Sequence, residues 1–391
     1  MPGLEITIPM ALQLVVEDVG WWGKSHPVGP HGPFRSGLHR RHHPSDYLAL
    51  VHLAEQLNMR PLIAFVACEW DRTNLLRKVP TATWMGSDWD NSPNVGPWLD
   101  QAARTLSDHR NRLEIGLHGV GHEYWHRGRR SRTEFHDQMG KMRPRAHIEA
   151  HLDAFAEIMD QNGLGPHPTA FVPPGLNHCF GEGDRGIHHL LNRRGICRVT
   201  TDLTRAKMVR APQHARMAWE NEVLIIDRGS AAVPWHVTAA RPRFSFAGPV
   251  LSLHWANLLD EDRQRSLTVV QRWVDYIKNG IDPLQQMLAP DTATCWTQFA
   301  YRAMSRIATG AGQVTIDMRP LRRIPQKTLK KTFFIRVVGA GSIRWRSHGG
   351  RIERCRGQSA AVQLLTLRPD DDADAIRLTP DGQSPAGAVN R

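Results

Sequence analysis

The chain has 391 residues, of which 41% are apolar and 23% charged. This composition is typical of a globular protein, and the lack of any apolar run of 18 or more residues excludes a membrane-spanning helix. The formal charge of +12 suits an anionic partner, but the basic residues are dispersed and match no nucleic-acid-binding motif, which argues against a nucleic-acid partner.

Seven short apolar runs alternate with helical patterns along the chain, and this alternation predicts βαβ units around a parallel sheet. Most of the runs are almost continuously apolar, as in strands that are covered on both faces. The predicted strands span residues 11–18, 60–68, 112–119, 168–174, 196–203, 222–229 and 249–255.

Helical patterns cover residues 44–58, 145–163 and 260–280. Ser45 is the expected N-cap of the first helix, because a serine hydroxyl can accept a hydrogen bond from a free backbone N–H at the helix start. Glycines at 163 and 280 are expected to end the other two helices.

The pattern changes after residue 310 into short strand-like runs with no helical pattern between them. We therefore expect residues 1–310 to form an α/β domain and residues 311–375 a small, sandwich-like β-rich accessory domain. Residues 376–391 contain Pro, Gly and Ser in a polar context and are expected to be a disordered tail.

The five cysteines are scattered and lack a CxxC spacing, which predicts reduced thiols rather than disulfides or a cysteine-based zinc site. The N-terminus lacks the basic and apolar regions of a signal peptide. Both features lead us to expect a cytoplasmic protein.

Ionisable side chains close several of the predicted strands. Glu17 and Asp18 end the first strand, His118 the third and His254 the seventh. In parallel α/β folds the carboxyl ends of the strands carry the reacting groups, so these four side chains are expected to converge on one face.

The third strand leads into the segment HGVGHEYW, in which His118 and His122 are four residues apart. A turn after this strand would direct both imidazoles toward one metal ion. Imidazole nitrogens and a carboxylate oxygen are standard zinc ligands, and three protein ligands with an open position describe a catalytic site. A strand-end carboxylate beside the two histidines therefore predicts a catalytic metal centre.

These motifs, followed by a strand ending in FVPP and by LSLHW, resemble the polysaccharide deacetylase family, also called the NodB-homology or carbohydrate esterase family 4 group. The resemblance covers roughly residues 8–300 and implies a distorted (β/α)7 TIM-like barrel. It implies that Asp18, His118 and His122 hold one divalent metal ion. Zinc is the default, and cobalt, nickel, manganese and iron are compatible with the same ligands.

The chain departs from the family pattern in several places. No hydroxyl residue lies between the two histidines, and Glu17 replaces the usual aspartate base with a side chain one methylene longer. The family's Arg-Pro-Pro-Tyr segment falls on residues 172–175, where Val172 and Gly175 replace the arginine and the tyrosine. These departures leave open whether activity is abolished or redirected to a substrate different from those of typical members.

In the mechanism that the resemblance implies, Glu17 accepts a proton from the attacking water and His254 protonates the leaving amine. Gly175 supplies the first backbone N–H after two prolines, which suits a donor to the oxyanion. Either Asp202 or Asp227, near the ends of the fifth and sixth strands, is expected to orient a histidine.

Thirteen tryptophans against four tyrosines is an unusual balance, and several tryptophans follow predicted strand ends, where indoles can stack on sugar rings. The long loop at residues 81–98 is a candidate lid. The residues expected to contact the substrate are Trp21, Trp22, Trp125, Asn177 and Trp255.

The resemblance implies a metal-dependent amide hydrolase that removes an N-acyl group, chiefly acetyl, from an amino sugar or glycoconjugate. The substrate would be a small molecule or an oligosaccharide, and the positive charge would suit a phosphate-bearing one. Two alternatives stay open. The chain could hydrolyse a cyclic or other non-sugar amide on the same scaffold, or it could be a catalytically silent carbohydrate-binding barrel.

Overall fold

The chain divides into two compact units in a computed structural model that describes residues 4–24, 32–208, 213–214, 216–310, 312–339, 341 and 343–381. The first, which we call the site unit, comprises residues 13–281 and 288–292. The second, which we call the β unit, comprises residues 1–12, 282–287 and 293–391.

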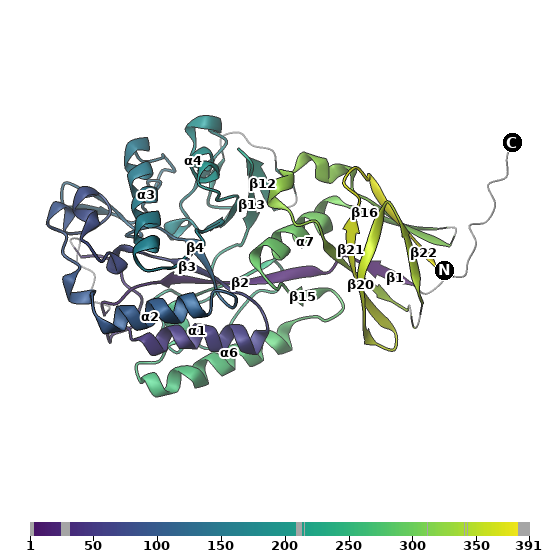
Figure 1. The fold of residues 1–391 in the computed structure, drawn as a ribbon, viewed down its shortest axis with the longest axis horizontal. Helices are drawn as coiled ribbons and strands as arrows, with labels where there is room; N and C mark the ends of the chain where they lie inside the picture. The colour runs from purple at the N-terminus through teal and green to yellow at the C-terminus, as the bar shows by residue number, and fades with distance from the viewer. Residues whose placement is uncertain are drawn as a thin grey trace. The chain divides into compact units, whose positions relative to one another are not determined.

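A curled sheet forms the centre of the site unit (Figure 1), with strand order β11-β12-β13-β9-β7-β4-β3-β2-β14. Seven described strands, from β13 to β14 in this order, run parallel to their neighbours. The bounds are β2 Met10–Val19, β3 Leu62–Phe65, β4 Glu114–Leu117, β7 Ala170–Phe171, β9 Arg198–Thr201, β11 Gln213–His214, β12 Met217–Glu220, β13 Val223–Asp227 and β14 Val250–His254.

The seven parallel strands coincide with the seven predicted apolar runs, and the α/β class is confirmed. The sheet is open among the described residues, with β14 at one edge and β11 at the other. The antiparallel strands β12 and β11 occupy the edge of β13 at which a barrel would close onto β14. The curl is therefore only part of the closed barrel that we expected.

Helices lie on both sides of this sheet in Figure 1, with α1 beside α6 on one side and α3 and α4 on the other. This arrangement explains why the strands are apolar along their whole length, since both faces are covered. The bounds are α1 Pro44–Leu57, α2 Pro97–Asp108, α3 Arg145–Gln161, α4 Ile187–Arg193, α5 Trp255–Leu258, α6 Ser266–Gly280 and α7 Thr292–Met304.

Two predicted helix starts are corrected by the structure. The N-cap of α1 is His43 rather than Ser45, because Pro44 takes the first helical position, where its missing N–H is not needed. Helix α6 begins at Ser266, six residues later than predicted. The residues before it form a short 3-10 turn that is capped by the Asp262 side chain.

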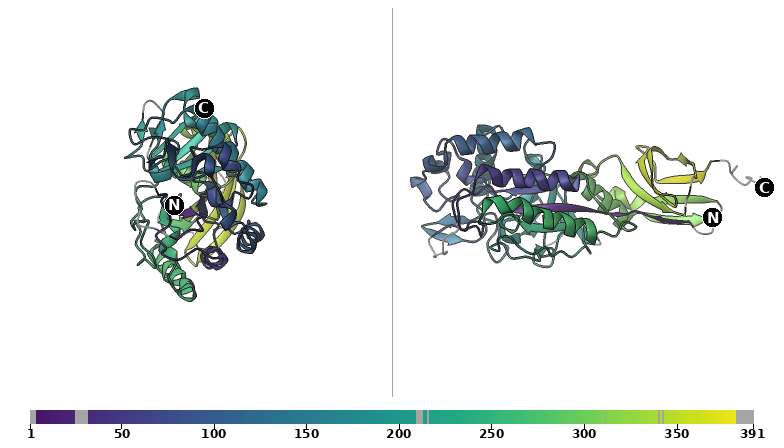
Figure 2. Two further views of the ribbon diagram at one scale, coloured as in Figure 1. Left: turned by 90° about the vertical axis from the view of Figure 1, so that its left-hand side faces the viewer. Right: turned by 90° about the horizontal axis from the view of Figure 1, so that it is seen from below.

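The β unit contains two four-stranded sheets, ordered β1-β18-β21-β20 and β16-β17-β22-β19. Figure 2 shows these strands from two further sides. Their bounds are β1 Glu5–Thr7, β16 Arg306–Gly310, β17 Gln313–Asp317, β18 Phe333–Val338, β19 Trp345–His348, β20 Gly350–Ser359, β21 Val362–Pro369 and β22 Ala375–Pro380. Short strands outside these two sheets complete the set among the described residues. They are β5 Tyr124–His126, β6 Arg129–Ser131, β8 Cys179–Phe180, β10 Lys207–Met208 and β15 Gln286–Leu288.

The β unit differs from the expected domain at residues 311–375. The N-terminal strand β1 pairs with β18, and β16 pairs with β17, so main-chain hydrogen bonds tie residues before 311 to this unit. Strand β22 covers residues that we expected in a disordered tail, because it pairs with both β17 and β19. Residues 382–391 of that tail lie outside the described residues.

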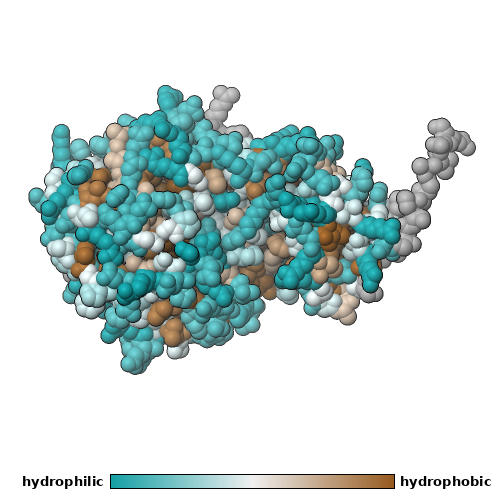
Figure 3. All heavy atoms as spheres, viewed as in Figure 1, coloured by the Kyte–Doolittle hydropathy of each residue, from teal (hydrophilic) through white to brown (hydrophobic). Residues whose placement is uncertain are grey.

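Hydrophilic side chains cover most of the face shown in Figure 3, and the brown apolar patches on it are small. In the described part of the chain, no helix is long and apolar enough to cross a membrane. The five cysteines, all at described positions, form no disulfide. The apolar residues instead gather in the interior, where strands such as β2 and β13 are buried at every position.

Candidate metal centre and active site

A bulge at the end of β2 directs two adjacent acids into the same cavity. Neighbouring side chains on a regular strand point to opposite faces of the sheet. The register of β2 against β3 shifts between Val16 and Val19, and Asp18 has a left-handed backbone with φ of 63°. This local break allows both Glu17 and Asp18 to line one cavity, which a regular strand would not permit.

The loop between the two candidate histidine ligands requires its two glycines. A Cβ at Gly119, where φ is 116°, would lie 2.2 Å from Oε2 of Glu134, and a Cβ at Gly121 would lie 1.9 Å from the carbonyl oxygen of Ala82. Glu134 is buried and accepts hydrogen bonds from the backbone N–H groups of Val120 and Gly121 at 3.0 and 3.2 Å. This chain has no hydroxyl residue between the two histidines. The loop is instead fixed by the hydrogen bonds from its backbone to the Glu134 carboxylate.

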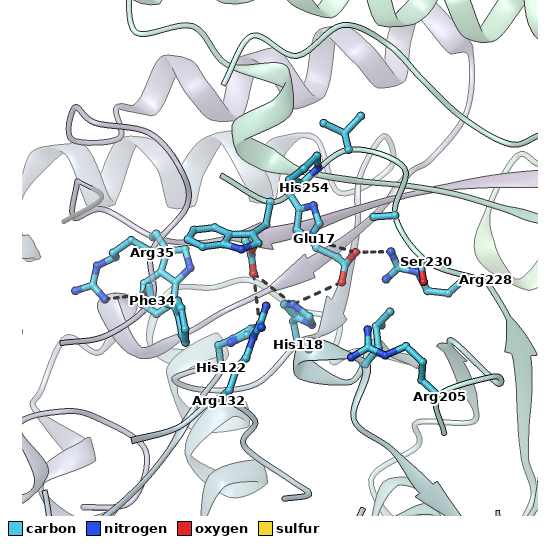
Figure 4. A pocket seen from close by; sticks show the side chains of 18 residues that line it. Glu17, Phe34, Arg35, His118, His122, Arg132, Arg205, Arg228, Ser230 and His254 are labelled. Carbon is cyan, nitrogen blue, oxygen red and sulfur yellow. Dashed lines mark hydrogen bonds and ion pairs between the residues drawn. The ribbon is translucent and has the colours of Figure 1, made fainter. Parts of the chain in front are cut away.

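Asp18, His118 and His122 all line the cavity, each offering a ligand atom within 4.8 Å of the others, and Figure 4 shows the two histidines side by side. Oδ1 of Asp18 lies 3.5 Å from Nε2 of His118 and 3.8 Å from Nε2 of His122. His122 has a left-handed backbone, with φ of 66°, that turns its ring toward the aspartate. The three ligand atoms come from the ends of β2 and β4 and from the loop that follows β4.

The tautomer of His118 follows from its second hydrogen bond. Nδ1 of His118 lies 2.7 Å from the carbonyl oxygen of Val172, and a carbonyl can only accept, so Nδ1 carries the proton. In the neutral ring Nε2 then presents its lone pair to the cavity. Val172 therefore orients a candidate ligand through its backbone, although its side chain lacks the guanidinium of the family's arginine.

The protonation states of the three groups are set by burial and by one another. Burial lowers the pKa of His122 to about 4, which keeps its ring neutral at pH 7. Burial alone would raise the pKa of Asp18, but the hydrogen bond with His118 and the charge of His122 hold it well below its ordinary value. Burial lowers the pKa of His118, and Asp18 and Glu17 outweigh that effect and raise it.

Glu17 lies beside the three candidate ligands and is held by an arginine from another strand. Nη2 of Arg228, the residue directly after β13, lies 2.5 Å from Oε1 of Glu17, and both side chains are at most 5% exposed. Burial would raise the pKa of Glu17, but the charges of Arg228 and His254 lower it to about 2. Glu17 is therefore ionised at neutral pH.

His254 stands at the end of β14 on the other side of Glu17, with Nε2 3.9 Å from Oε1 of the glutamate. It is partly exposed in the cavity, and its backbone N–H donates to the side chain of Asn257 at 2.8 Å. Glu17 therefore lies between a candidate metal ligand, His118 at 4.0 Å, and a second imidazole that faces the cavity.

The cavity above these groups has a volume of about 260 Å³. Trp21, Phe34 and Trp235 form an aromatic wall, in which the rings of Phe34 and Trp235 meet edge to face with centroids 5.8 Å apart. Gly175 lines the cavity with a left-handed backbone, φ 58°, and a Cβ at this position would lie 2.9 Å from the Thr133 side chain. The site thus combines ionised groups, a possible backbone donor and flat apolar surfaces.

Four of the expected substrate contacts lie elsewhere, and these predictions are corrected. Trp22 packs in the core against Tyr47 and Trp70, and Trp255 stacks on His42 with ring centroids 4.1 Å apart. Both tryptophans are at most 3% exposed, as is Trp125. The Asn177 side chain turns toward the carbonyl oxygen of Asp137, at 3.4 Å. None of these four side chains lines the described cavity.

The expected histidine partners and lid are also corrected. Asp202 accepts hydrogen bonds from Thr204 and Ser230, and Asp227 pairs with Arg216 at 2.8 Å, so both carboxylates bind groups other than histidine. Residues 81–98 line no part of this cavity among the described residues. Their Trp89 is buried and donates to Asp71 at 3.1 Å, whereas the Trp84 ring lies 4.5 Å from the guanidinium of Arg35, a lining residue.

Several lining residues were missed in the sequence, including Arg228. A signal was present, because Arg228 lies near the end of the strand predicted at residues 222–229, directly after Asp227, and only the aspartate was considered as a site residue. The aromatic residues Phe34 and Trp235 and the cations Arg35, Arg132 and Arg205 lie in loops, where no periodic pattern indicates which way a side chain points.

No family model matches the chain, and no curated protein matches it. Similar solved structures include a family 4 carbohydrate esterase from Streptomyces lividans in complex with acetate, with 10% identity, a TM-score of 0.31, and coverage of 72% of this chain and 94% of that one. A Mycobacterium smegmatis protein assigned as a polysaccharide deacetylase has 12% identity, a TM-score of 0.37, and coverage of 63% and 74%.

A Parabacteroides distasonis protein assigned as a glycoside hydrolase/deacetylase has 9% identity with this chain and a TM-score of 0.41, with coverage of 85% of this chain and 82% of that one. Identities of 9–12% and TM-scores of 0.31–0.41 describe distant likenesses in fold. Function must therefore follow from the residues of the site.

Proposed function

We propose that the protein is a metal-dependent amide hydrolase that removes an N-acyl group, chiefly acetyl, from an amino sugar or glycoconjugate. The observation that carries this proposal is the convergence of Asp18, His118 and His122 on one cavity that also contains an ionised Glu17. The roles given below to individual residues belong to the same proposal.

The donor set fits a divalent metal ion. Two imidazole nitrogens and one carboxylate oxygen lie close enough to share an ion, and the cavity leaves room for a further ligand. The proton on Nδ1 of His118 leaves Nε2 free to coordinate, and a neutral His122 is the form that binds metals. A metal ion bound there, zinc by default, would supply Lewis-acid polarisation of the amide carbonyl and a lowered pKa for water.

Glu17 and His254 divide the proton transfers. Glu17 is ionised and accepts the proton of the attacking water, while Arg228 holds its carboxylate in place. His254 faces the same carboxylate from the other side and delivers a proton to the nitrogen of the departing amine. Amide cleavage needs both transfers, because an unprotonated amine is a poor leaving group.

The remaining walls bind and orient the substrate. The backbone N–H of Gly175 donates to the developing oxyanion in this proposal, which is supported by the position of Gly175 in the cavity lining. Trp21, Phe34 and Trp235 present aromatic faces and edges on which the apolar face of a sugar ring can rest. We further infer that the open sheet is a distorted, incomplete (β/α)7 barrel and that the β unit is an accessory domain.

The proposal is tested by measuring metal content and acetate release together. The wild-type protein should bind about one equivalent of a divalent metal and release acetate from N-acetylated amino sugars. The double variant Asp18→Ala, His118→Ala should lose both properties. The matched control is Asp160→Ala, His167→Ala, which removes the same two residue types from an exposed pair whose Nε2 and Oδ1 lie 3.3 Å apart.

Two outcomes would contradict the proposal. The first is the absence of bound metal in the wild-type protein even after reconstitution with divalent ions. The second is metal bound at the triad with no acetate released from any N-acetylated sugar, whether free, oligomeric or phosphorylated. A control variant that retains metal and activity shows that losses in the other variant come from the site.

A further inference from the structure

The cavity walls carry more positive charge than the proposed reaction needs. Four arginines line the cavity, whereas its carboxylates are Glu17 and Asp18 alone among the described lining residues. A divalent metal at the triad would add to this imbalance. The lining arginines are Arg35, Arg132, Arg205 and Arg228.

Two of these arginines form ion pairs with buried carboxylates. Nη2 of Arg35 lies 2.6 Å from Oε1 of Glu69, and Nη2 of Arg228 lies 2.5 Å from Oε1 of Glu17. Arg228 is only partly satisfied by this pair, because its buried Nε and Nη1 have no hydrogen-bond partner in the described part of the chain. Two N–H-bearing nitrogens of this buried guanidinium therefore lack a partner among the described residues.

The other two arginines are exposed. The guanidinium of Arg132 lies 5.5 Å from the ring of Phe34 in the aromatic wall. Within the described ranges, neither Arg132 nor Arg205 forms an ion pair. The acid nearest in sequence to Arg205 is Asp202, which is already bound by the backbone and hydroxyl of Thr204 and by the hydroxyl of Ser230.

Figure 4 shows Arg132 and Arg205 on the opposite side of His118 and His122 from His254 in that view. They are thus placed away from the group that is proposed to protonate the amine. Guanidinium groups bind phosphate and carboxylate in preference to neutral hydroxyls, since the fork of N–H donors matches two oxygens of an oxyanion. A neutral N-acetyl sugar would leave both charges without a counter-ion.

We propose that the substrate carries an anionic group, a phosphate or a carboxylate, in addition to its N-acyl group, and that Arg132 and Arg205 bind this anion. The inference rests on the proposed hydrolase function and adds the substrate class. The positive cavity also draws an anionic substrate toward the metal centre, because a concave surface of one sign focuses the electric field.

The test compares matched neutral and anionic ligands of the metal-loaded protein. N-acetylglucosamine is the neutral ligand, its 6-phosphate and 1-phosphate carry a phosphate, and its 3-O-lactyl ether carries a carboxylate. We expect kcat/KM for at least one anionic ligand to exceed that for the neutral sugar by about tenfold or more, as charge-assisted hydrogen bonds predict. The phosphate and carboxylate ligands together identify which anion is preferred.

The variant Arg132→Gln, Arg205→Gln should reduce this preference to about twofold or less, since glutamine keeps the hydrogen-bonding capacity but not the charge. Arg104→Gln, Arg272→Gln is the matched control, because these exposed helix arginines lie outside the cavity lining and their loss changes the net charge equally. The control should keep the full preference. Equal loss in both variants would overturn the inference, as it would point to overall charge.

Binding to the Glu17→Gln variant, measured by calorimetry, separates failure of the inference from failure of the proposed function. Equal affinity for neutral and anionic ligands overturns the inference, while hydrolysis of the neutral sugar would leave the hydrolase function intact. Tighter binding of an anionic ligand, lost in Arg132→Gln, Arg205→Gln, supports the inference even when no ligand is hydrolysed. Anion binding without hydrolysis would thus contradict the proposed hydrolase function and leave the inference about the anion standing.

Discussion

The site unit contains two buried histidine groups that differ in what surrounds them. In the metal triad, His118 and His122 share one aspartate oxygen and line a cavity. The second group, which we call the core histidine cluster, comprises His136, His178, His188 and Glu220, and all three imidazoles are at most 1% exposed. Among the described residues, no member of this cluster lines the cavity beside Asp18, and its ligand atoms do not form a group that could share one metal ion.

Hydrogen bonds link His178, His188 and Glu220 to one another, whereas both ring nitrogens of His136 and Nδ1 of His178 have no hydrogen-bond partner in the described part of the chain. Nε2 of His178 lies 2.8 Å from Nε2 of His188, and Nδ1 of His188 is hydrogen-bonded to Glu220. Glu220 also accepts the backbone N–H of Gly181 at 2.7 Å. The comparison shows that histidine count does not make a metal site. The proposed metal site differs from the cluster because one carboxylate and two imidazole nitrogens converge beside a cavity.

The largest difference should appear when the carboxylate beside the first group, Glu17, and the carboxylate of the core histidine cluster, Glu220, are each changed to an amide. Glu17→Gln removes the proton acceptor and should lower kcat by about 10²- to 10⁴-fold with metal content unchanged. Glu220→Gln should leave kcat within about twofold, because Glu220 lies outside the cavity lining. Steady-state kinetics with metal analysis checks both, and equal losses would mean that the groups are not functionally distinct.

Arg228→Met should have the next largest effect, on stability. It leaves the buried Glu17 carboxylate without its partner, and breaking one side of a buried ion pair costs about 3–5 kcal/mol. Denaturant unfolding of the metal-free protein measures this loss. Arg272→Met on the exposed face of α6 is the control, and should stay within about 0.5 kcal/mol of wild type. A loss of similar size in both variants would show that the pair is not the cause.

The same unfolding experiment on Glu220→Gln should show a smaller loss, of about 1–3 kcal/mol. The amide cannot accept from both His188 and Gly181 as a carboxylate does, so a buried donor is left poorly satisfied. Metal content should stay at the wild-type level. A Glu220→Gln protein that loses its metal would contradict the separation of the core histidine cluster from the metal triad.

The smallest expected effect is on the pH dependence of stability. Burial lowers the pKa of His136 to about 3 in the folded chain, against about 6.5 when unfolded. Below pH 6.5 the unfolded chain therefore binds a proton that the folded chain does not, and stability falls as the pH drops from 6.5 toward 3. His136→Phe should reduce this slope by up to about 1.4 kcal/mol per pH unit. Unfolding curves at pH 7, 6 and 5 measure the slope, and an unchanged slope would rule out His136 as its source.

The elements of the site unit could be predicted because burial on both faces leaves a strong apolar signal in parallel strands. The same logic placed Glu17, Asp18, His118 and His254 at strand ends, and the structure brings these four side chains to one cavity. Neither closure of the sheet nor the direction of a loop side chain has a local sequence signal. For that reason the antiparallel edge beyond β13, the packing of Trp255 on His42 and the pairing of Arg228 with Glu17 were not predicted.

The left-handed backbones of Asp18 and His122 have a consequence for how the protein would respond to its environment. Such conformations cost roughly 1–2 kcal/mol each for residues with a side chain, and here both belong to candidate metal ligands. A ligand that binds only the folded chain offsets this cost and raises the melting temperature in proportion to the logarithm of its concentration. The melting temperature would then rise with the supply of metal, and the protein would be less stable to heat in a cell that is short of metal.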